Sequence, residues 1–147
     1  MLSYAFAILM GTAAVFAAFW GAGLESKARK QYYEQHFAAK LELYLPGENP
    51  ILYRLSRTSY ILGRRPRKCD IQINHNSVSR IHALITRANN AYYIQPAYNE
   101  DARKWGVVYI NGQRLPNSPC QLRSGDHIHL GEVSITYEEE QKNERKP

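Results

Sequence analysis

From Leu41 onward, apolar residues recur at every second position in short runs, and turn-forming residues separate these runs. The first run, Leu41–Leu45, alternates apolar and polar side chains and is followed by the turn cluster Pro-Gly-Glu-Asn-Pro. A period of two is typical of a strand with one buried face, and no stretch with a helical period intervenes. Short strands spaced roughly 8–12 residues apart indicate a sandwich of two sheets. The sequence therefore predicts an all-β domain.

The remaining strands are expected from the same alternation. They are Ile51–Ser56, Ser59–Leu62, Ile71–Ile73, His82–Arg87, Ala91–Gln95, Val107–Ile110, Asp126–Leu130 and Val133–Tyr137. Asn89-Asn90, Asn111-Gly112 and Gly131-Glu132 are expected to form tight turns, because Asn and Gly accept the positive φ angles that such turns require.

The N-terminal part of the chain has a different character. Residues 1–24 carry no charge, and Tyr4 and Trp20 lie near the two ends of this apolar run. A helix over Leu2–Leu24 would reach roughly 34 Å, which is enough to cross the hydrocarbon core of a bilayer. A cleaved signal peptide is the alternative, but the run has no basic residue before it and exceeds the usual length of a signal-peptide core. We expect an uncleaved, single-pass anchor over residues 1–24.

The charges that flank this run predict its orientation. Lys27, Arg29 and Lys30 follow the run directly, and no basic residue precedes it. The positive-inside rule places the N-terminus outside the cell membrane and the rest of the chain in the cytoplasm. Residues 25–39 are expected to be a polar helix or linker, and residues 40–138 the folded domain. The apolar-poor residues 139–147 are expected to be a disordered tail.

Charge and cysteine content restrict the partners. The formal net charge is +6, and all of it lies after residue 24, which favours phosphopeptides, acidic lipid head groups or nucleic acid. Cys69 and Cys120 fit no metal-binding spacing, and a reducing compartment is the simplest interpretation.

The chemistry-bearing residues are concentrated between Leu62 and Ala83. Gly63-Arg64 ends an apolar run, and a basic loop follows it before the next strand. A turn-rich segment then delivers Val78-Ser79-Arg80 into a further strand. Two loops therefore leave neighbouring strands, one with a guanidinium group and the other with a hydroxyl beside a second guanidinium. Such a set of donors suits a phosphate dianion.

This arrangement resembles the forkhead-associated (FHA) domain, a β-sandwich that reads phosphothreonine. The matching residues are Gly63-Arg64, Asp70-Ile71, Val78-Ser79-Arg80, His82-Ala83 and Asn111-Gly112, and the resemblance covers about Leu41 to Glu138. Together with the apolar N-terminal run, the resemblance predicts an FHA-type β-sandwich preceded by one transmembrane helix.

The resemblance also implies roles for single residues. Arg64 would hold the phosphate, Ser79 would donate its hydroxyl to a phosphate oxygen, and Arg80 would add a second cation. His82 would be structural and tie the Ser79 loop to the strand behind it. Gly63, Asn111 and Gly112 would be structural members of the motif.

One part of the family pattern is missing. An asparagine of a Ser/Thr-x-Asn-Gly-Thr-like run usually contacts the backbone of the bound peptide, whereas this chain has Trp105-Gly106-Val107-Val108 there. Gly106 has no side chain for that contact. The preceding loop, Tyr98 to Lys104, is longer than usual, and Asn99 or another group of this loop is the candidate substitute. Asn99, Trp105 and Gly106 complete the predicted peptide-binding set.

Other classes of function lack their residues. The basic run Arg64–Lys68 has no helix reader or interleaved aromatic residues for nucleic acid. His127 and His129 share a strand face but have no third metal ligand nearby in the sequence. No nucleotide loop and no nucleophile–base pattern appears, so we expect neither an enzyme nor a bound cofactor or metal.

Two functional hypotheses follow. In the first, the chain is a membrane-anchored adaptor that binds a phosphothreonine-containing protein, either a Ser/Thr kinase or its substrate. In the second, it is a membrane scaffold that uses the same fold to dock a partner without phosphate. The chain is also similar to small bacterial proteins with one N-terminal span and a C-terminal FHA domain, and this similarity suggests a role in cell-wall synthesis or cell division.

Overall fold

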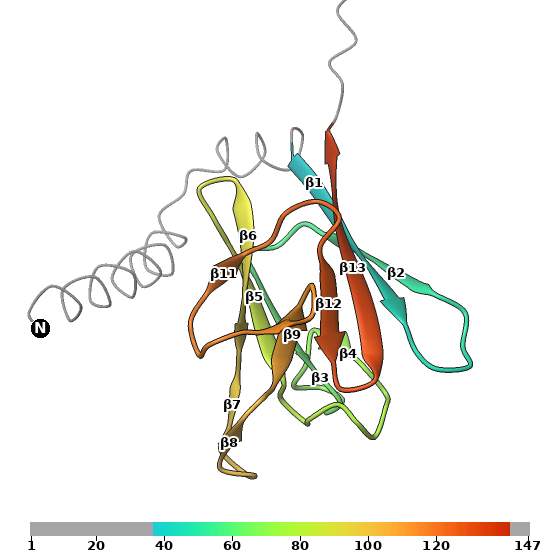
Figure 1. Cartoon of the computed structure of the whole chain (residues 1–147), viewed down its shortest axis with the longest axis vertical. Helices are drawn as coiled ribbons and strands as arrows, with labels where there is room; N and C mark the ends of the chain where they lie inside the picture. The colour runs from blue at the N-terminus through green and yellow to red at the C-terminus, as the bar shows by residue number, and fades with distance from the viewer. Residues whose placement is uncertain (1–36, 142–147) are drawn as a thin grey trace, which may run out of the picture.

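Two sheets face each other in the computed structural model, which describes residues 37–141 (Figure 1). The first sheet has the strand order β10-β9-β12-β13-β1-β2, the second has the order β11-β6-β5-β3-β4, and β7 and β8 form a separate two-stranded ribbon. All neighbouring strands are antiparallel except β3 and β4, which are parallel. The predicted all-β sandwich is confirmed.

The strands have the following bounds. They are β1 (Phe37–Tyr44), β2 (Ile51–Leu55), β3 (Ser59–Gly63), β4 (Ile71–Gln72), β5 (Ala83–Ala88), β6 (Ala91–Pro96), β7 (Tyr98–Asn99), β8 (Lys104–Trp105), β9 (Val108–Ile110), β10 (Gln113–Arg114), β11 (Cys120–Gln121), β12 (His127–Leu130) and β13 (Val133–Gln141).

The core lies between the two sheets, where alternate side chains point inward. In β12, Ile128 and Leu130 are buried while His127 and His129 are exposed. Tyr137 of β13 meets Tyr92 of β6 edge to face across the interior, with ring centroids 6.4 Å apart. Burial of one large apolar side chain contributes about 1.5–3 kcal/mol, so these inward rows hold the two sheets together.

Both ends of the domain extend further than the sequence indicates. Strand β1 begins at Phe37, inside the range expected to be a linker, and β13 continues to Gln141, inside the range expected to be a tail. The two strands pair without interruption from Phe37 opposite Gln141 to Tyr44 opposite Ser134. Lys40 lies 3.2 Å from Glu138 and 3.7 Å from Glu140, so it compensates the acidic run that resembles a solvated tail.

The predicted membrane-spanning helix over residues 1–24, and most of the predicted linker and tail, lie outside the described residues. Within residues 37–141, no helix is long and apolar enough to cross a membrane.

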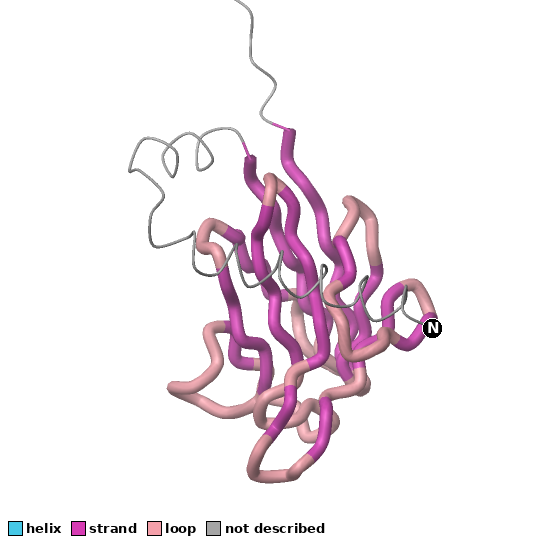
Figure 2. The backbone as a smooth tube through the Cα atoms, turned by 90° about the vertical axis from the view of Figure 1, so that its left-hand side faces the viewer, coloured by secondary structure: helices cyan, strands magenta, loops and turns pink. Residues whose placement is uncertain are grey.

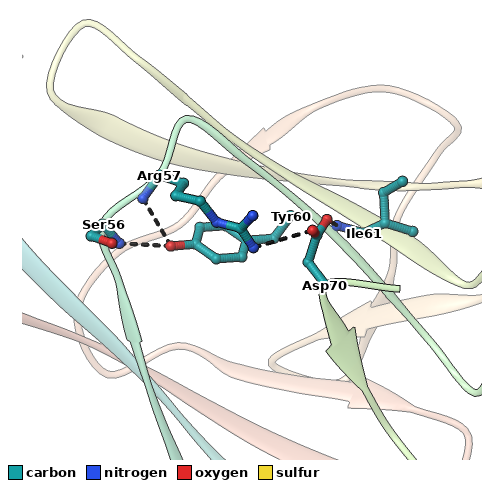
Figure 3. A network of polar contacts seen from close by, with 5 residues as sticks. All are labelled: Ser56, Arg57, Tyr60, Ile61 and Asp70. Atoms are coloured by element: carbon teal, nitrogen blue, oxygen red, sulfur yellow. Dashed lines mark hydrogen bonds and ion pairs between the residues drawn. The ribbon is translucent and has the colours of Figure 1, made fainter. Parts of the chain in front are cut away.

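A polar network fixes the path of β3 (Figure 3). The Tyr60 hydroxyl accepts hydrogen bonds from the backbone N–H groups of Ser56, at 2.7 Å, and Arg57, at 2.8 Å. The Asp70 carboxylate accepts the Ile61 N–H at 2.8 Å and an ion pair from Arg57 at 3.1 Å. The guanidinium of Arg57 also lies over the Tyr60 ring. These contacts tie the loop between β2 and β3, and the residue that precedes β4, to β3.

The sandwich has two distinct ends. Phe37 and Gln141 are paired at one end, where β1 begins and β13 finishes. The loops that follow β3 and β4, the β7–β8 ribbon and the turn between β12 and β13 gather at the opposite end (Figures 1 and 2). The chain termini of the described domain are therefore far from these loops.

Candidate functional site

A pocket of about 430 Å³ opens among the loops at this second end. Three segments of the chain line it: the end of β3, the loop between β4 and β5, and the β7–β8 ribbon. The lining residues are Arg64, Asn76, Ser77, Val78, Ser79, Arg80, Asn99, Asp101, Ala102 and Lys104.

Backbone hydrogen bonds bring the first two segments together. The Arg64 N–H donates to the Ser79 carbonyl at 3.0 Å, and the Arg65 N–H donates to the Arg80 carbonyl at 3.1 Å. Gly63 allows this close approach, because a Cβ atom there would overlap the Arg80 carbonyl. The local sequence Gly-Arg thus places the Arg64 side chain directly beside Ser79 and Arg80.

The guanidinium groups of Arg64 and Arg80 are both available to a ligand. Among residues 37–141, no side chain forms an ion pair or hydrogen bond with the guanidinium of Arg64 or Arg80. The Ser79 hydroxyl likewise has no partner in this part of the chain. One hydrogen bond between such a donor and a charged acceptor contributes about 1.5–3 kcal/mol, so an anion in the pocket would satisfy several donors at once.

His82 holds the Ser79 loop from behind. Its Nδ1 accepts the Ser79 N–H at 3.0 Å, and its Nε2 lies 2.8 Å from the Val107 carbonyl. Because Nδ1 accepts, the ring proton must be on Nε2, which donates to Val107. Burial lowers the pKa of His82, partly opposed by the bond to Val107, so the neutral ring is favoured. His82 therefore positions Ser79 and does not face the pocket.

Gly106 completes this support. It is buried, and a Cβ atom there would overlap the His82 carbonyl. Its N–H donates to the Ala97 carbonyl at 2.9 Å, and the Ala97 N–H donates to the His82 carbonyl at 3.0 Å. Gly106 thus lies under the histidine and does not line the pocket, although the sequence placed it among the peptide-binding residues.

The β7–β8 ribbon has one polar and one aromatic face. Asn99 pairs with Lys104 and Tyr98 pairs with Trp105 across the ribbon. Asn99 and Lys104 line the pocket, so the alternation of a strand turns the aromatic pair the other way. Tyr98 and Trp105 contact each other edge to face and remain 44% and 46% exposed. Trp105 therefore lies on the outer face of the ribbon and not in the pocket.

Asn99 is the predicted substitute for the missing asparagine, and it does reach the pocket. It is buried, and its Oδ1 accepts the N–H groups of Asp101, at 3.1 Å, and Ala102, at 3.3 Å. These two bonds shape the loop that follows β7.

The remaining motif residues form a turn outside the pocket lining. Asn111 and Gly112 both have positive φ, at 49° and 80°. The Asn111 amide donates to Asp126 at 3.0 Å and accepts the His127 N–H at 3.0 Å. Asn111 and Gly112 connect β9 to β10, and the two hydrogen bonds of Asn111 hold the start of β12 in place.

Sequence reasoning missed two charged residues of the pocket. Lys104 adds a third cation, and Asp101 adds a carboxylate that pairs with Arg65 at 3.0 Å. Both belong to the loop that the sequence marks as unusually long and charged. The sequence does not show that this loop folds as a ribbon with Asn99 opposite Lys104.

The domain is similar to a known protein family and to several solved structures. A family model described as the FHA domain matches residues 60–131. No curated protein matches the chain. Among solved structures, the Slr1951 protein from Synechocystis sp. is 33% identical with a TM-score of 0.59, and the match covers 72% of this chain and 99% of that one.

Two further structures have the same fold. The FHA domain of the CT664 protein from Chlamydia trachomatis is 20% identical, with a TM-score of 0.58, and the match covers 69% of this chain and 96% of that domain. Mycobacterium tuberculosis EmbR, solved in complex with a low-affinity phosphopeptide, is 26% identical with a TM-score of 0.55. That match covers 69% of this chain and 24% of EmbR.

Proposed function

The chain belongs to the FHA domain family, and from this premise we propose that it binds phosphothreonine-containing segments of a partner protein and holds that partner at a membrane. One observation carries the proposal. Arg64, Ser79 and Arg80 line a single pocket, and the two guanidinium groups and the Ser79 hydroxyl have no hydrogen-bond or ion-pair partner within residues 37–141.

Binding would follow from the geometry of this wall. The Arg64 guanidinium and the Ser79 hydroxyl donate to phosphate oxygens, and Arg80 compensates the second negative charge. His82 fixes the Ser79 backbone before the ligand arrives, so little conformational entropy is lost when the phosphate binds. The domain contributes recognition and no chemical step.

The membrane part of the proposal is supported by the sequence. Residues 1–24 carry no charge, and Lys27, Arg29 and Lys30 follow them. This pattern favours a single-pass anchor in the cell membrane, with the N-terminus outside and the FHA domain in the cytoplasm. The partner would then be a Ser/Thr kinase or its substrate, recruited to the inner face of the membrane. A role in cell-wall synthesis or cell division extends this proposal, on the similarity to small bacterial proteins of this arrangement.

Binding of the full chain, in detergent micelles, to a degenerate phosphothreonine peptide library tests the proposal. The chain should select phosphorylated peptides over their threonine counterparts. Arg64→Ala should weaken binding roughly 30- to 150-fold, because it removes a charge-assisted donor worth about 2–3 kcal/mol. Ser79→Ala should cost about 1.5–3 kcal/mol for the same reason.

The matched control is Arg54→Ala, which removes an exposed arginine on β2, outside the pocket. It should leave the affinity unchanged, and all three variants should keep the thermal midpoint of the original chain. If no phosphopeptide binds in a way that depends on Arg64, the phosphate-independent scaffold replaces this proposal.

A further inference from the structure

Arg64, Ser79 and Arg80 form the first wall of the pocket, and the β7–β8 ribbon lines it as a second wall. A chain of polar contacts connects the two walls. The Arg65 N–H donates to the Arg80 carbonyl, and the Arg65 Nη1 lies 3.0 Å from Asp101 Oδ2. The Asp101 N–H in turn donates to Asn99 Oδ1 at 3.1 Å. The contacts therefore run without a gap from the loop that carries Ser79 and Arg80 to the β7–β8 ribbon.

This chain of contacts leaves two donors of the ribbon facing the pocket. The Oδ1 of Asn99 is occupied by the loop, whereas its Nδ2 has no partner among the described residues. No fully buried side-chain nitrogen or oxygen in residues 37–141 lacks a hydrogen-bond partner, so this Nδ2 retains some solvent access although Asn99 is only 4% exposed. Asn99 is also one of the residues that line the pocket. Lys104 lies directly opposite Asn99 and also lines it.

Asp101 is a negatively charged residue in the lining of a pocket that is proposed to bind an anion. A carboxylate that lines a pocket for a phosphate dianion repels the ligand, unless the carboxylate has another task. Its ion pair with Arg65 is largely solvent-exposed, with 39% and 57% of the two side chains accessible, so it adds little to the stability of the fold. Positioning of the ribbon is the task that the contacts of Asp101 support.

We propose that the Arg65–Asp101 ion pair positions the β7–β8 ribbon across the pocket, so that Asn99 and Lys104 form a second wall of the ligand site. Lys104 is a third cation for the phosphate group, and the Nδ2 of Asn99 donates to a backbone carbonyl of the bound peptide. This inference rests on the proposed function and names the residues that replace the missing asparagine of the family pattern.

The first test measures the affinity of the full chain in micelles for an alanine peptide centred on one phosphothreonine. Lys104→Met keeps the length of the side chain and removes its charge. It should weaken binding about tenfold and reduce the dependence of affinity on salt. The matched control is Arg103→Met, since Arg103 is the neighbouring cation but does not line the pocket. If both variants lost the same affinity, Lys104 would contribute only to the general positive charge around the pocket. That result would overturn its assignment to the second wall.

The second test uses the sign of the Asp101 effect. Asp101→Asn removes a negative charge from the pocket, so simple repulsion predicts tighter binding. Positioning predicts the opposite, about three- to tenfold weaker binding, and Arg65→Gln should weaken it as much. The double variant should then bind no worse than either single variant, because both remove the same contact. Thermal midpoints should not change. Tighter binding of Asp101→Asn, or additive losses, would overturn the positioning role.

The same peptide separates this inference from the function on which it rests. If Arg64→Ala abolishes binding while Lys104→Met and Asp101→Asn change it less than about twofold, the second wall is wrong and the phosphothreonine site stands. If Arg64→Ala itself has no effect, the proposed function fails, and the second wall fails with it.

Discussion

At the scale of single residues, His82 couples the ligand loop to the interior of the domain. Its ring receives the Ser79 N–H on one side and donates to the Val107 carbonyl on the other. Only the neutral ring with its proton on Nε2 can make both bonds. A second proton on Nδ1 would remove the acceptor for Ser79.

This arrangement predicts a pH dependence of stability. Burial lowers the pKa of His82 below its ordinary value of 6.5 in the folded state, while the unfolded chain has the ordinary value. As the pH falls below the ordinary value, the unfolded state takes up the proton first, and the free energy of unfolding decreases. The decrease should stop once the pH passes the lowered pKa of the folded state.

Urea unfolding between about pH 7.5 and pH 5, the range around the ordinary histidine pKa, should reveal this decrease. His82→Asn should remove most of it, and should cost about 1–3 kcal/mol at the upper pH because the Val107 carbonyl loses its donor. His129→Gln, at an exposed histidine of β12, is the control and should keep the decrease. An unaltered pH dependence in His82→Asn would contradict the role of this ring.

Some residues of the site can be predicted from the sequence, and others cannot. Arg64, Ser79 and Arg80 come from two loops whose order and spacing are visible in the sequence, and the structure brings them to one pocket. The contact of Lys104 with the same pocket depends on the pairing of Asn99 with Lys104, which no local pattern records.

At the scale of elements, length decides which strands can be predicted. Strand β6 has six residues, long enough for buried side chains to recur at every second position, at Tyr92, Ile94 and Pro96. Strands β7 and β8 have two residues each and carry no period. The sequence therefore predicts only a loop from Tyr98 to Lys104, and it predicts Trp105 in the site although Trp105 lies on the outer face of the ribbon.

The segment after the ribbon predicts an effect of overpacking. A Cβ atom at Gly106 would overlap the backbone carbonyl of His82 and would also press on the His82 ring. Gly106→Ala should therefore reduce the free energy of unfolding by about 1–3 kcal/mol, measured with urea. It should also weaken phosphopeptide binding, since His82 supports Ser79.

Gly47→Ala provides the comparison for this prediction. Gly47 has a positive φ of 74° but open space around it, so alanine there brings backbone strain without a clash. Its cost should stay near 1 kcal/mol, and binding should not change. A Gly106→Ala variant as stable as the original chain would show that the neighbouring backbone yields more easily than its contacts indicate.

At the scale of the whole molecule, the boundaries of the domain depend on pairing across the chain. The acidic run Glu138–Glu140 looks like a tail when it is read alone. Its partners in β1 are Lys40, Ala39 and Ala38, about a hundred residues earlier, so only the assembled sheet shows that it is a strand. Long-range pairing of this kind is what a local reading of the sequence cannot contain.

The proposed topology gives a prediction for the intact cell. In a Cys69→Ala, Cys120→Ala background, Asn49→Cys should react with an impermeant maleimide only after the membrane is permeabilised, because the proposed topology puts the exposed turn that contains Asn49 in the cytoplasm. Ser3→Cys should react in intact cells. Labelling of Asn49→Cys without permeabilisation would reverse the orientation.

Phe37 and Gln141, the paired limits of the described domain, lie far from the pocket, and this separation has a mechanical consequence. A pull between Phe37 and a ligand held at the opposite end of the sandwich acts along β1, which is hydrogen-bonded to β13 on one side and to β2 on the other. The load then shears these ladders, and many hydrogen bonds resist it together instead of opening one after another. The pocket loops lie outside these paired strands. Under tension, the domain should therefore release its ligand before β1 separates from β13 and β2.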